Sequence, residues 1–148
     1  MDIRKTIVFI GNSEEDRQLF ETAAASNKRY SFLALDNEPY SISLLKKSQP
    51  FWYHVIFFDL STPSILGVSF LKQIVAIPQM KHVPVVACID TYSGSYDCTL
   101  REAGVSYCIK KAIEPTNLDS LFNCFEKNEL LPYHLYTKGE NINAAYFG

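Results

Sequence analysis

Short runs of apolar residues alternate along the chain with longer segments in which apolar residues recur every three or four positions. Continuous apolar runs of this length are typical of strands buried on both faces, and the wider spacing is typical of amphipathic helices. The pattern predicts strands at residues 7–10, 30–35, 55–58, 84–89 and 105–109, and helices at 13–26, 39–48, 64–76, in a polar segment from 91 to about 104, and from 115 onward.

Because strand and helix alternate five times, the sequence predicts an α/β fold, in which helices cover both faces of a parallel sheet. The pattern is predicted to form one domain over residues 1–128. Residues 129–148 lie outside it and form a C-terminal tail. This tail is apolar enough to dock on the domain or on a partner, so we expect part of it to be ordered.

Two local features refine the predicted helices. Ser13 is followed three residues later by Asp16, which resembles the capping box that begins many helices. In the second predicted helix, Ile42, Leu44 and Leu45 are expected to be buried.

Composition places the chain among globular proteins. It has 148 residues, of which 47% are hydrophobic and 20% charged, and its formal net charge is −2. No basic excess is available for nucleic acid or an anionic membrane, so neither is expected as a partner. No apolar window is long enough to span a bilayer, and no signal-peptide pattern opens the chain, so a cytoplasmic location is expected.

The cysteines and histidines offer little chemistry of their own. The four cysteines are ten or more residues apart and are expected to be reduced thiols, without a zinc site or disulfides. They are Cys88, Cys98, Cys108 and Cys124. The histidines are His54, His82 and His134. His54 and His82 precede strands, at the end of the sheet opposite the candidate site, and are expected on the surface.

Ligands of doubly wound sheets bind at the carboxyl ends of the strands. The candidate site therefore consists of the residues that follow each predicted strand. These are Gly11, Asn12 and Ser13 after the first strand, Asp59 after the third, Ile89, Asp90 and Thr91 after the fourth, and Lys110 and Lys111 after the fifth.

Asp59, Pro63 and Gly67 have the spacing Asp-x-x-x-Pro-x-x-x-Gly directly after the most hydrophobic strand. This segment resembles the phosphoacceptor loop of bacterial response-regulator receiver domains. The fourth-strand segment 83–86 and the segment 103–111, which runs from Ala-Gly into a lysine, resemble the same family in the same order. The resemblance implies a flavodoxin-like, doubly wound sheet of five parallel strands in the order 2-1-3-4-5, with five helices.

The resemblance also implies a function and its residues. Asp59 falls on the aspartate that accepts a phosphoryl group from a histidine kinase or phosphotransfer protein, and Lys111 falls on the lysine that pairs with that group. The family binds Mg²⁺ beside the aspartate, where Ser61 would offer its backbone carbonyl. A downstream protein would bind the face formed by the fourth helix, fifth strand and fifth helix, which here includes Tyr92, Tyr96, Tyr107 and Phe125. Such a module is a switch and not an enzyme.

Several family positions hold other residues in this chain. The acidic pair that binds the metal falls on Gly11 and Asn12, and the hydroxyl position after the fourth strand falls on Ile89. The aromatic switch position falls on Cys108. Asn12, Asp59 and the Ser61 carbonyl remain as metal ligands, so weak Mg²⁺ binding at most is expected. Glu14 or Glu15 could supply an acid if its side chain extended to the site, but both are expected to be solvated in the first turn of the helix.

Three hypotheses follow. The first is a stand-alone receiver that is phosphorylated on Asp59 despite an impaired Mg²⁺ site. The second is a pseudo-receiver, in which Asp59 and Lys111 form an ion pair and the fold serves as a phosphorylation-independent protein-interaction module. The third, a flavodoxin-like enzyme or nucleotide binder, is disfavoured, because the loop after the first strand has one glycine and then three acids that would repel phosphate.

Overall fold

The computed structural model describes residues 5–47, 53–60, 65–90, 99–100, 102–110, 118–119 and 121–123. Its strands are β1 (Lys5–Ile10), β2 (Tyr30–Leu35), β3 (Tyr53–Asp59), β4 (Val85–Ile89) and β5 (Tyr107–Lys110). Its helices are α1 (Glu14–Ala25), α2 (Pro39–Lys47), α3 (Ile65–Val75) and the short 3-10 helix η2 (Pro78–Met80). Among these described residues, no helix is long and apolar enough to cross a membrane.

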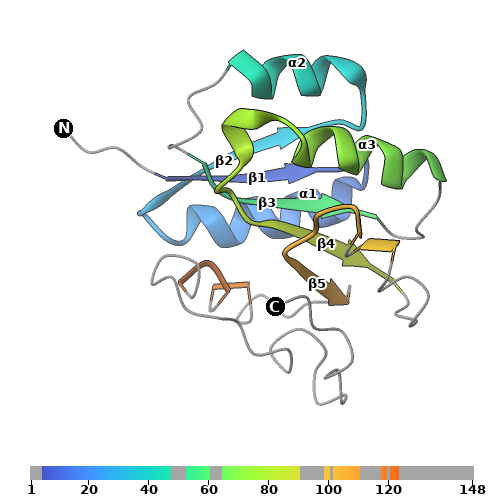
Figure 1. Ribbon diagram of the computed structural model, residues 1–148. Helices are drawn as coiled ribbons and strands as arrows, with labels where there is room; N and C mark the ends of the chain where they lie inside the picture. The colour runs from blue at the N-terminus through green and yellow to red at the C-terminus, as the bar shows by residue number, and fades with distance from the viewer. Residues whose placement is uncertain are drawn as a thin grey trace.

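The five strands form one parallel sheet in the order β2-β1-β3-β4-β5, which confirms the predicted fold class and strand order. The central strand β3 pairs with β1 on one side and β4 on the other, so that Phe58 lies beside Ile10 and Asp59 lies beside Cys88. Because all strands run in the same direction, their carboxyl ends lie along one edge of the sheet (Figure 1).

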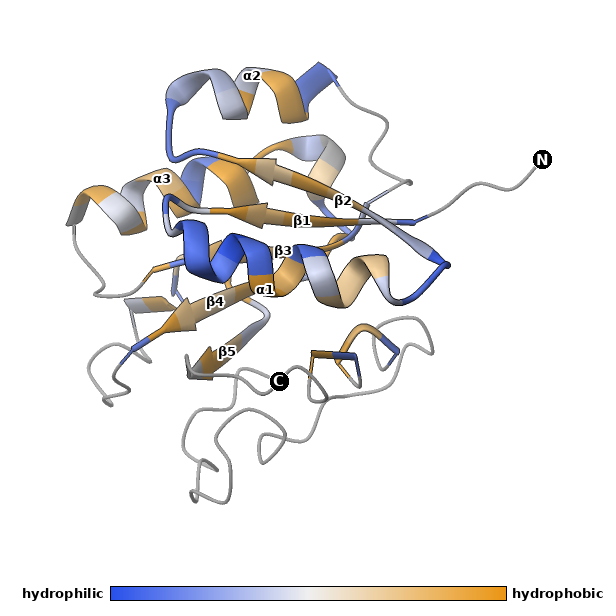
Figure 2. Cartoon of the chain, turned by 180° about the vertical axis from the view of Figure 1, so that it is seen from behind, coloured by the Kyte–Doolittle hydropathy of each residue, from blue (hydrophilic) through white to orange (hydrophobic). Residues whose placement is uncertain are grey.

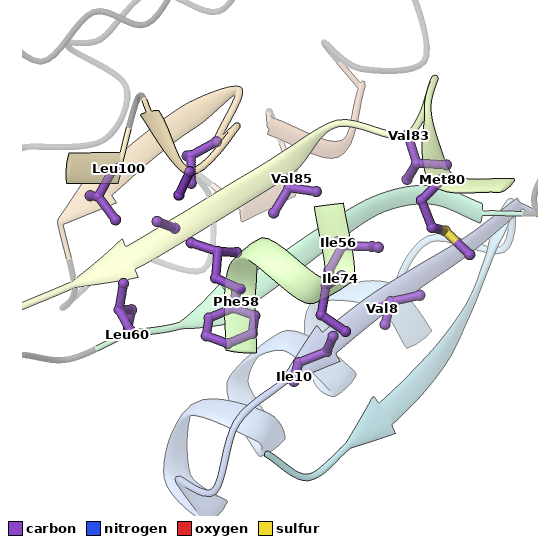
Figure 3. Close-up of a cluster of buried hydrophobic side chains, with 14 of the residues drawn as sticks. Val8, Ile10, Ile56, Phe58, Leu60, Ile74, Met80, Val83, Val85 and Leu100 are labelled. Carbon is purple, nitrogen blue, oxygen red and sulfur yellow. The ribbon is translucent and has the colours of Figure 1, made fainter. Parts of the chain in front are cut away.

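Alternate residues of each strand point to opposite faces of the sheet, so the sheet separates two hydrophobic cores. On one face, Phe9 and Phe57 pack against Phe20 of α1. The opposite face is covered by α2 and α3 (Figure 1), and Figure 3 shows Ile74 of α3 above Ile10 and Phe58. Burial on both faces explains why the central strands read as continuous apolar runs.

The strand bounds lie within two residues of those predicted. The segment 30–35 is a strand as predicted. β1 starts two residues early, at Lys5, because polar residues extend its pairing with β2 and the Thr6 and Ser31 hydroxyl oxygens lie 3.2 Å apart. β5 starts two residues late, at Tyr107, since Ser106 donates its N–H to Val85 O before the ladder begins.

The helices are confirmed only in part. Three of the five predicted helices are α1, α2 and α3. Residues 99, 100 and 102, and residues 118, 119 and 121–123, are helical where the last two are predicted. The remainder of both segments, and the predicted tail 129–148, lie outside the described residues.

Two burial predictions are wrong. Leu44 is 41% exposed, because Ser41 and Leu45 occupy the face of α2 that meets the sheet, and Leu44 lies about 100° around the helix from Leu45. His54 is 7% exposed and not on the surface, because β3 begins at Tyr53 and so carries His54 into the sheet. Cys88 and Cys108 are buried in β4 and β5, and His82 is exposed as expected.

Candidate functional site

Asp59 is the last residue of the central strand β3 and lies at the carboxyl edge of the sheet. Its backbone is held on the β4 side, because Asp59 pairs with Cys88 and the next residue, Leu60, donates its N–H to Cys88 O at 2.8 Å. Leu60 itself is buried in the core under α3. These contacts leave the Asp59 side chain half-buried on the same face as Phe57, the face covered by α1.

Gly11 lies directly beside Asp59 at the end of β1. Its backbone N–H donates to Leu35 O of β2 at 3.0 Å, so Gly11 remains attached to the sheet after β1 ends. A Cβ atom built on Gly11 would lie 2.5 Å from the Asp59 Cβ and 3.2 Å from the Asp59 Oδ2. The side chain of Asp59 therefore occupies space that any larger residue at position 11 would need.

Asn12 is exposed and is engaged on the other side of β1. Its side-chain Oδ1 accepts a long hydrogen bond, 3.4 Å, from the backbone N–H of Asn37. Asn37 follows β2, whereas Asp59 ends β3, and β1 separates these two strands in the sheet. The contact thus directs the Asn12 carbonyl oxygen toward the loop between β2 and α2.

The acidic first turn of α1 is used on the helix surface (Figure 2). Ser13 caps the helix as predicted, since its hydroxyl accepts the N–H of Asp16 at 3.2 Å. The Glu14 carboxylate forms an ion pair with Arg17, and this guanidinium holds the pKa of Glu14 below its usual value. Arg17 also contacts Glu21 at 2.8 Å. Glu14 is therefore committed to Arg17 and does not supply the missing acid beside Asp59.

No protein-family model matches the chain, and no curated protein sequence matches it. Solved structures do match. The chemotaxis response regulator CheY4 of Vibrio cholerae has a TM-score of 0.69 at 16% identity, over 82% of this chain and 98% of that one. A signal receiver domain of a two-component histidine kinase from Clostridium thermocellum has a TM-score of 0.70 at 19% identity, over 83% and 98%. A putative pilus assembly-related protein from Burkholderia pseudomallei has a TM-score of 0.69 at 10% identity, over 88% and 96%.

The chain has the receiver-domain fold. At these low identities the likeness establishes the fold, and the chemistry of the site depends on this chain's own residues. The position of Asp59 at the carboxyl end of β3, on the central strand, is where the sequence resemblance expects the phosphoacceptor of a receiver.

Two further receiver-fold positions are apolar and buried. Ile89, at the hydroxyl position, is fully buried in the core under α3 together with Leu60. Cys108, at the aromatic switch position, is 3% exposed in the same core. The residue after Ile89, Asp90, is exposed. At the two positions where the sequence resemblance places a hydroxyl and an aromatic ring, this chain therefore has buried side chains that pack in the core.

Two predicted site residues, Lys111 and Ser61, lie outside the described residues, as do Tyr92, Tyr96 and Phe125 of the predicted partner face. Tyr107 of that face is half-buried, and partial burial raises the pKa of its hydroxyl. The backbone of Lys110 ends β5 beside Ile89.

The described residues do not fit the Mg²⁺ ion that the receiver fold implies. A hard cation such as Mg²⁺ prefers several oxygen ligands, usually including carboxylates. In the described part of the chain no three His, Cys, Asp or Glu side chains come together in a way that could hold a metal. Beside Asp59, Gly11 offers no side chain, and Asn12 is directed toward Asn37.

Sequence reasoning missed the contact between Gly11 and Asp59. It treated Gly11 as a lost ligand and did not consider that the neighbouring side chain takes up the vacated space. A usable signal was present, because a glycine that directly follows a buried strand often marks a place where another chain segment approaches closely.

Proposed function

We propose that this receiver-fold chain is a response-regulator module of two-component signal transduction and that Asp59 is its phosphoacceptor. The observation that carries the proposal is the position of Asp59. It is a half-buried carboxylate at the carboxyl end of the central strand, where the Leu60–Cys88 hydrogen bond holds the backbone and the side chain lies over Gly11 at the end of β1. In parallel α/β sheets this edge is where ligands bind.

The proposed reaction is a phosphoryl transfer from a partner's phosphohistidine. An Asp59 carboxylate oxygen forms a bond to phosphorus, the phosphorus–nitrogen bond breaks, and the histidine ring keeps the electron pair. The module supplies the nucleophile, and a histidine kinase or phosphotransfer protein supplies the phosphoryl group. Lys111 is proposed to pair with the transferred group, and any Mg²⁺ bound by Asp59, Asn12 and the Ser61 carbonyl is expected to bind weakly.

The transferred charge would act through the protein surface. A phosphoryl group adds close to two negative charges at the end of β3 and shifts the balance between two arrangements of the adjoining loops. A downstream protein is proposed to recognise the outcome at the face that includes Tyr107 and the segments around the predicted fourth and fifth helices.

A second function, the phosphorylation-independent pseudo-receiver, is favoured by one specific observation. Ile89 is fully buried where a receiver needs a hydroxyl for the phosphoryl oxygen. In that case the chain would be a protein-interaction module switched by association alone.

Incubation with acetyl phosphate, with and without Mg²⁺, followed by prompt intact-mass measurement, separates the two functions. The first predicts a gain of one phosphoryl group that Asp59→Asn abolishes. No gain in any condition, together with no heat of Mg²⁺ binding by calorimetry, would support the pseudo-receiver. Asp36→Asn is the matched control, because Asp36 is an exposed aspartate that follows β2 at the same edge of the sheet.

A further inference from the structure

We infer that Gly11 is a positioning residue for Asp59: by having no side chain, it lets Asp59 lie over the end of β1. This inference rests on the proposed function insofar as Asp59 is the working residue. It concerns the packing of the site, which can be measured whether or not a phosphoryl group is ever transferred.

The side chain of Asp59 lies closer to the Cβ position of Gly11 than the spacing of the sheet requires. Neighbouring strands lie about 4.8 Å apart, and side chains at paired positions are separated by a similar distance. A Cβ on Gly11 would lie only 2.5 Å from the Asp59 Cβ, far inside van der Waals contact, and 3.2 Å from the Phe9 ring. Beyond the pair Ile10 and Phe58, the side chain of Asp59 therefore fills the space beside Gly11.

If the end of β1 and the end of β3 moved apart, each would lose a backbone hydrogen bond to the strand on its other side. The N–H of Gly11 donates to Leu35 O of β2 at 3.0 Å. On the opposite side, the N–H of Leu60 donates to Cys88 O of β4 at 2.8 Å. A side chain at position 11 would thus have to fit between the ends of β1 and β3, which are held in place by hydrogen bonds to β2 and β4.

This geometry gives a second reason to expect weak cation binding. Position 11 lacks an acid, and the packing of Asp59 against Gly11 also leaves no space for one. The Asp59 Oδ2 lies 3.2 Å from the place where a side chain at position 11 would begin. An acidic residue at position 11 could act as a metal ligand only after Asp59 had moved. Asp59 thus occupies the space that an acidic side chain at position 11 would need.

Gly104 provides a matched control. A Cβ at Gly104 would lie 2.6 Å from the Val75 Cγ1, and its φ of +95° also disfavours a side chain. Gly104→Ala therefore introduces a comparably close clash with the side chain of Val75, and not with Asp59. Any effect that is specific to Gly11→Ala reflects the contact with Asp59 and not a general loss of stability.

The main experiment is a double-mutant cycle followed by thermal unfolding. Gly11→Ala is expected to lower Tm by about 5 °C or more, because the added methyl group has no space. Asp59→Gly removes the Asp59 Cβ, with which the new methyl group would clash. In that background Gly11→Ala should therefore lower Tm by less than half as much as it does in the parent chain. Asp59→Ala keeps the Cβ and should rescue little. The cost of Gly104→Ala should be the same in all three backgrounds.

A spectroscopic measurement tests position directly. Gly11→Ala is expected to shift the ¹³C resonances of the Asp59 Cβ and carboxyl group, while Gly104→Ala leaves them unchanged. Equal costs of Gly11→Ala in all three backgrounds, or unchanged Asp59 resonances, would overturn the inference. If Gly11→Ala fails to fold, folding of the Gly11→Ala, Asp59→Gly double variant supports the contact, and failure of both refutes it. A chain that never accepts phosphate would refute the proposed function and leave these results intact.

Discussion

The two ends of the sheet differ in how their polar side chains are used. At the amino end, the Tyr30 hydroxyl and His54 Nε2 both lie within hydrogen-bond distance of Phe122 O, at 2.9 and 3.0 Å, and both side chains are buried. At the carboxyl end, Asp59 is half-buried beside Gly11, and the neighbouring position 89 is an isoleucine.

Tyr30, His54 and Phe122, which we call the amino-end cluster, have a structural role. A carbonyl oxygen can only accept, so His54 must carry its proton on Nε2, and the two donors use both lone pairs of Phe122 O. The ring of His54 also stacks on Tyr30, with centroids 5.0 Å apart. Together Tyr30 and His54 attach the helical residues 121–123 to β2 and β3.

The comparison teaches that burial of a polar residue does not by itself mark the functional end of this molecule. His54 and Tyr30 are buried because their polar atoms share one acceptor, whereas Asp59 stays accessible at the edge where ligands of such sheets bind. Substitutions at the amino end should therefore change stability, and substitutions of Asp59 should change modification by a phosphodonor.

The largest effect is expected at His54. Replacing His54 by Ala removes a buried ring, its stacking on Tyr30 and one hydrogen bond, so the free energy of unfolding should fall by about 3 kcal/mol. Urea denaturation gives this value. The control is His82→Ala, which removes an exposed ring and should change stability by no more than about 0.5 kcal/mol. Equal losses for the two variants would mean that the amino-end cluster contributes nothing.

The next effect is expected at Ile89, where Ile89→Thr would introduce the hydroxyl that the receiver resemblance places at this position. Because Ile89 is fully buried, the new hydroxyl should lose hydration, and the variant should be less stable by about 2 kcal/mol. Ile89→Val, which only removes a carbon, should cost about 1 kcal/mol. The Thr variant could instead be as stable as the Val variant and more readily modified by acetyl phosphate. The hydroxyl would then be able to contact the phosphoryl group, and burial of position 89 would not be what limits phosphorylation of Asp59.

Much of the fold could be predicted from the sequence, because local patterns determine it. The segment 30–35 forms its strand as predicted, and Ser13 caps α1 as predicted, since both depend on residues close together in the chain. Asp59 could also be placed, because a residue that directly follows a buried parallel strand must lie at the carboxyl edge of the sheet.

The contacts between distant segments could not be predicted. The sequence placed His54 outside a strand, and nothing local shows that it lies beside Phe122, 68 residues away. Likewise, nothing near Gly11 in the sequence shows that the side chain of Asp59 takes up the space beside it. Leu44 shows a subtler limit, because it is apolar but lies outside the face of α2 that meets the sheet, which Ser41 and Leu45 occupy.

The smallest effect concerns the acidic first turn of α1, and it tests whether Glu14 belongs to the site or to the helix. Arg17 lowers the pKa of Glu14 in the folded chain. A carboxyl whose folded-state pKa is lowered contributes stability above its unfolded pKa, and this contribution is lost as the pH falls through the folded value. Glu14→Gln should thus lower Tm slightly at pH 7, and the difference from the parent chain should shrink as the pH falls below the usual range of a glutamate pKa.

The matched control for Glu14→Gln is Glu15→Gln, which removes the same charge from the same helix turn. Both variants lose the interaction with the helix dipole, so the excess loss in Glu14→Gln reports the pair with Arg17. High salt should reduce that excess, because the pair is exposed. Identical pH profiles for the two variants would show that the Arg17 pair does not hold Glu14. Glu14 would then again be available as the acid missing beside Asp59, and the contrast between the two ends of the sheet would be weaker than the geometry indicates.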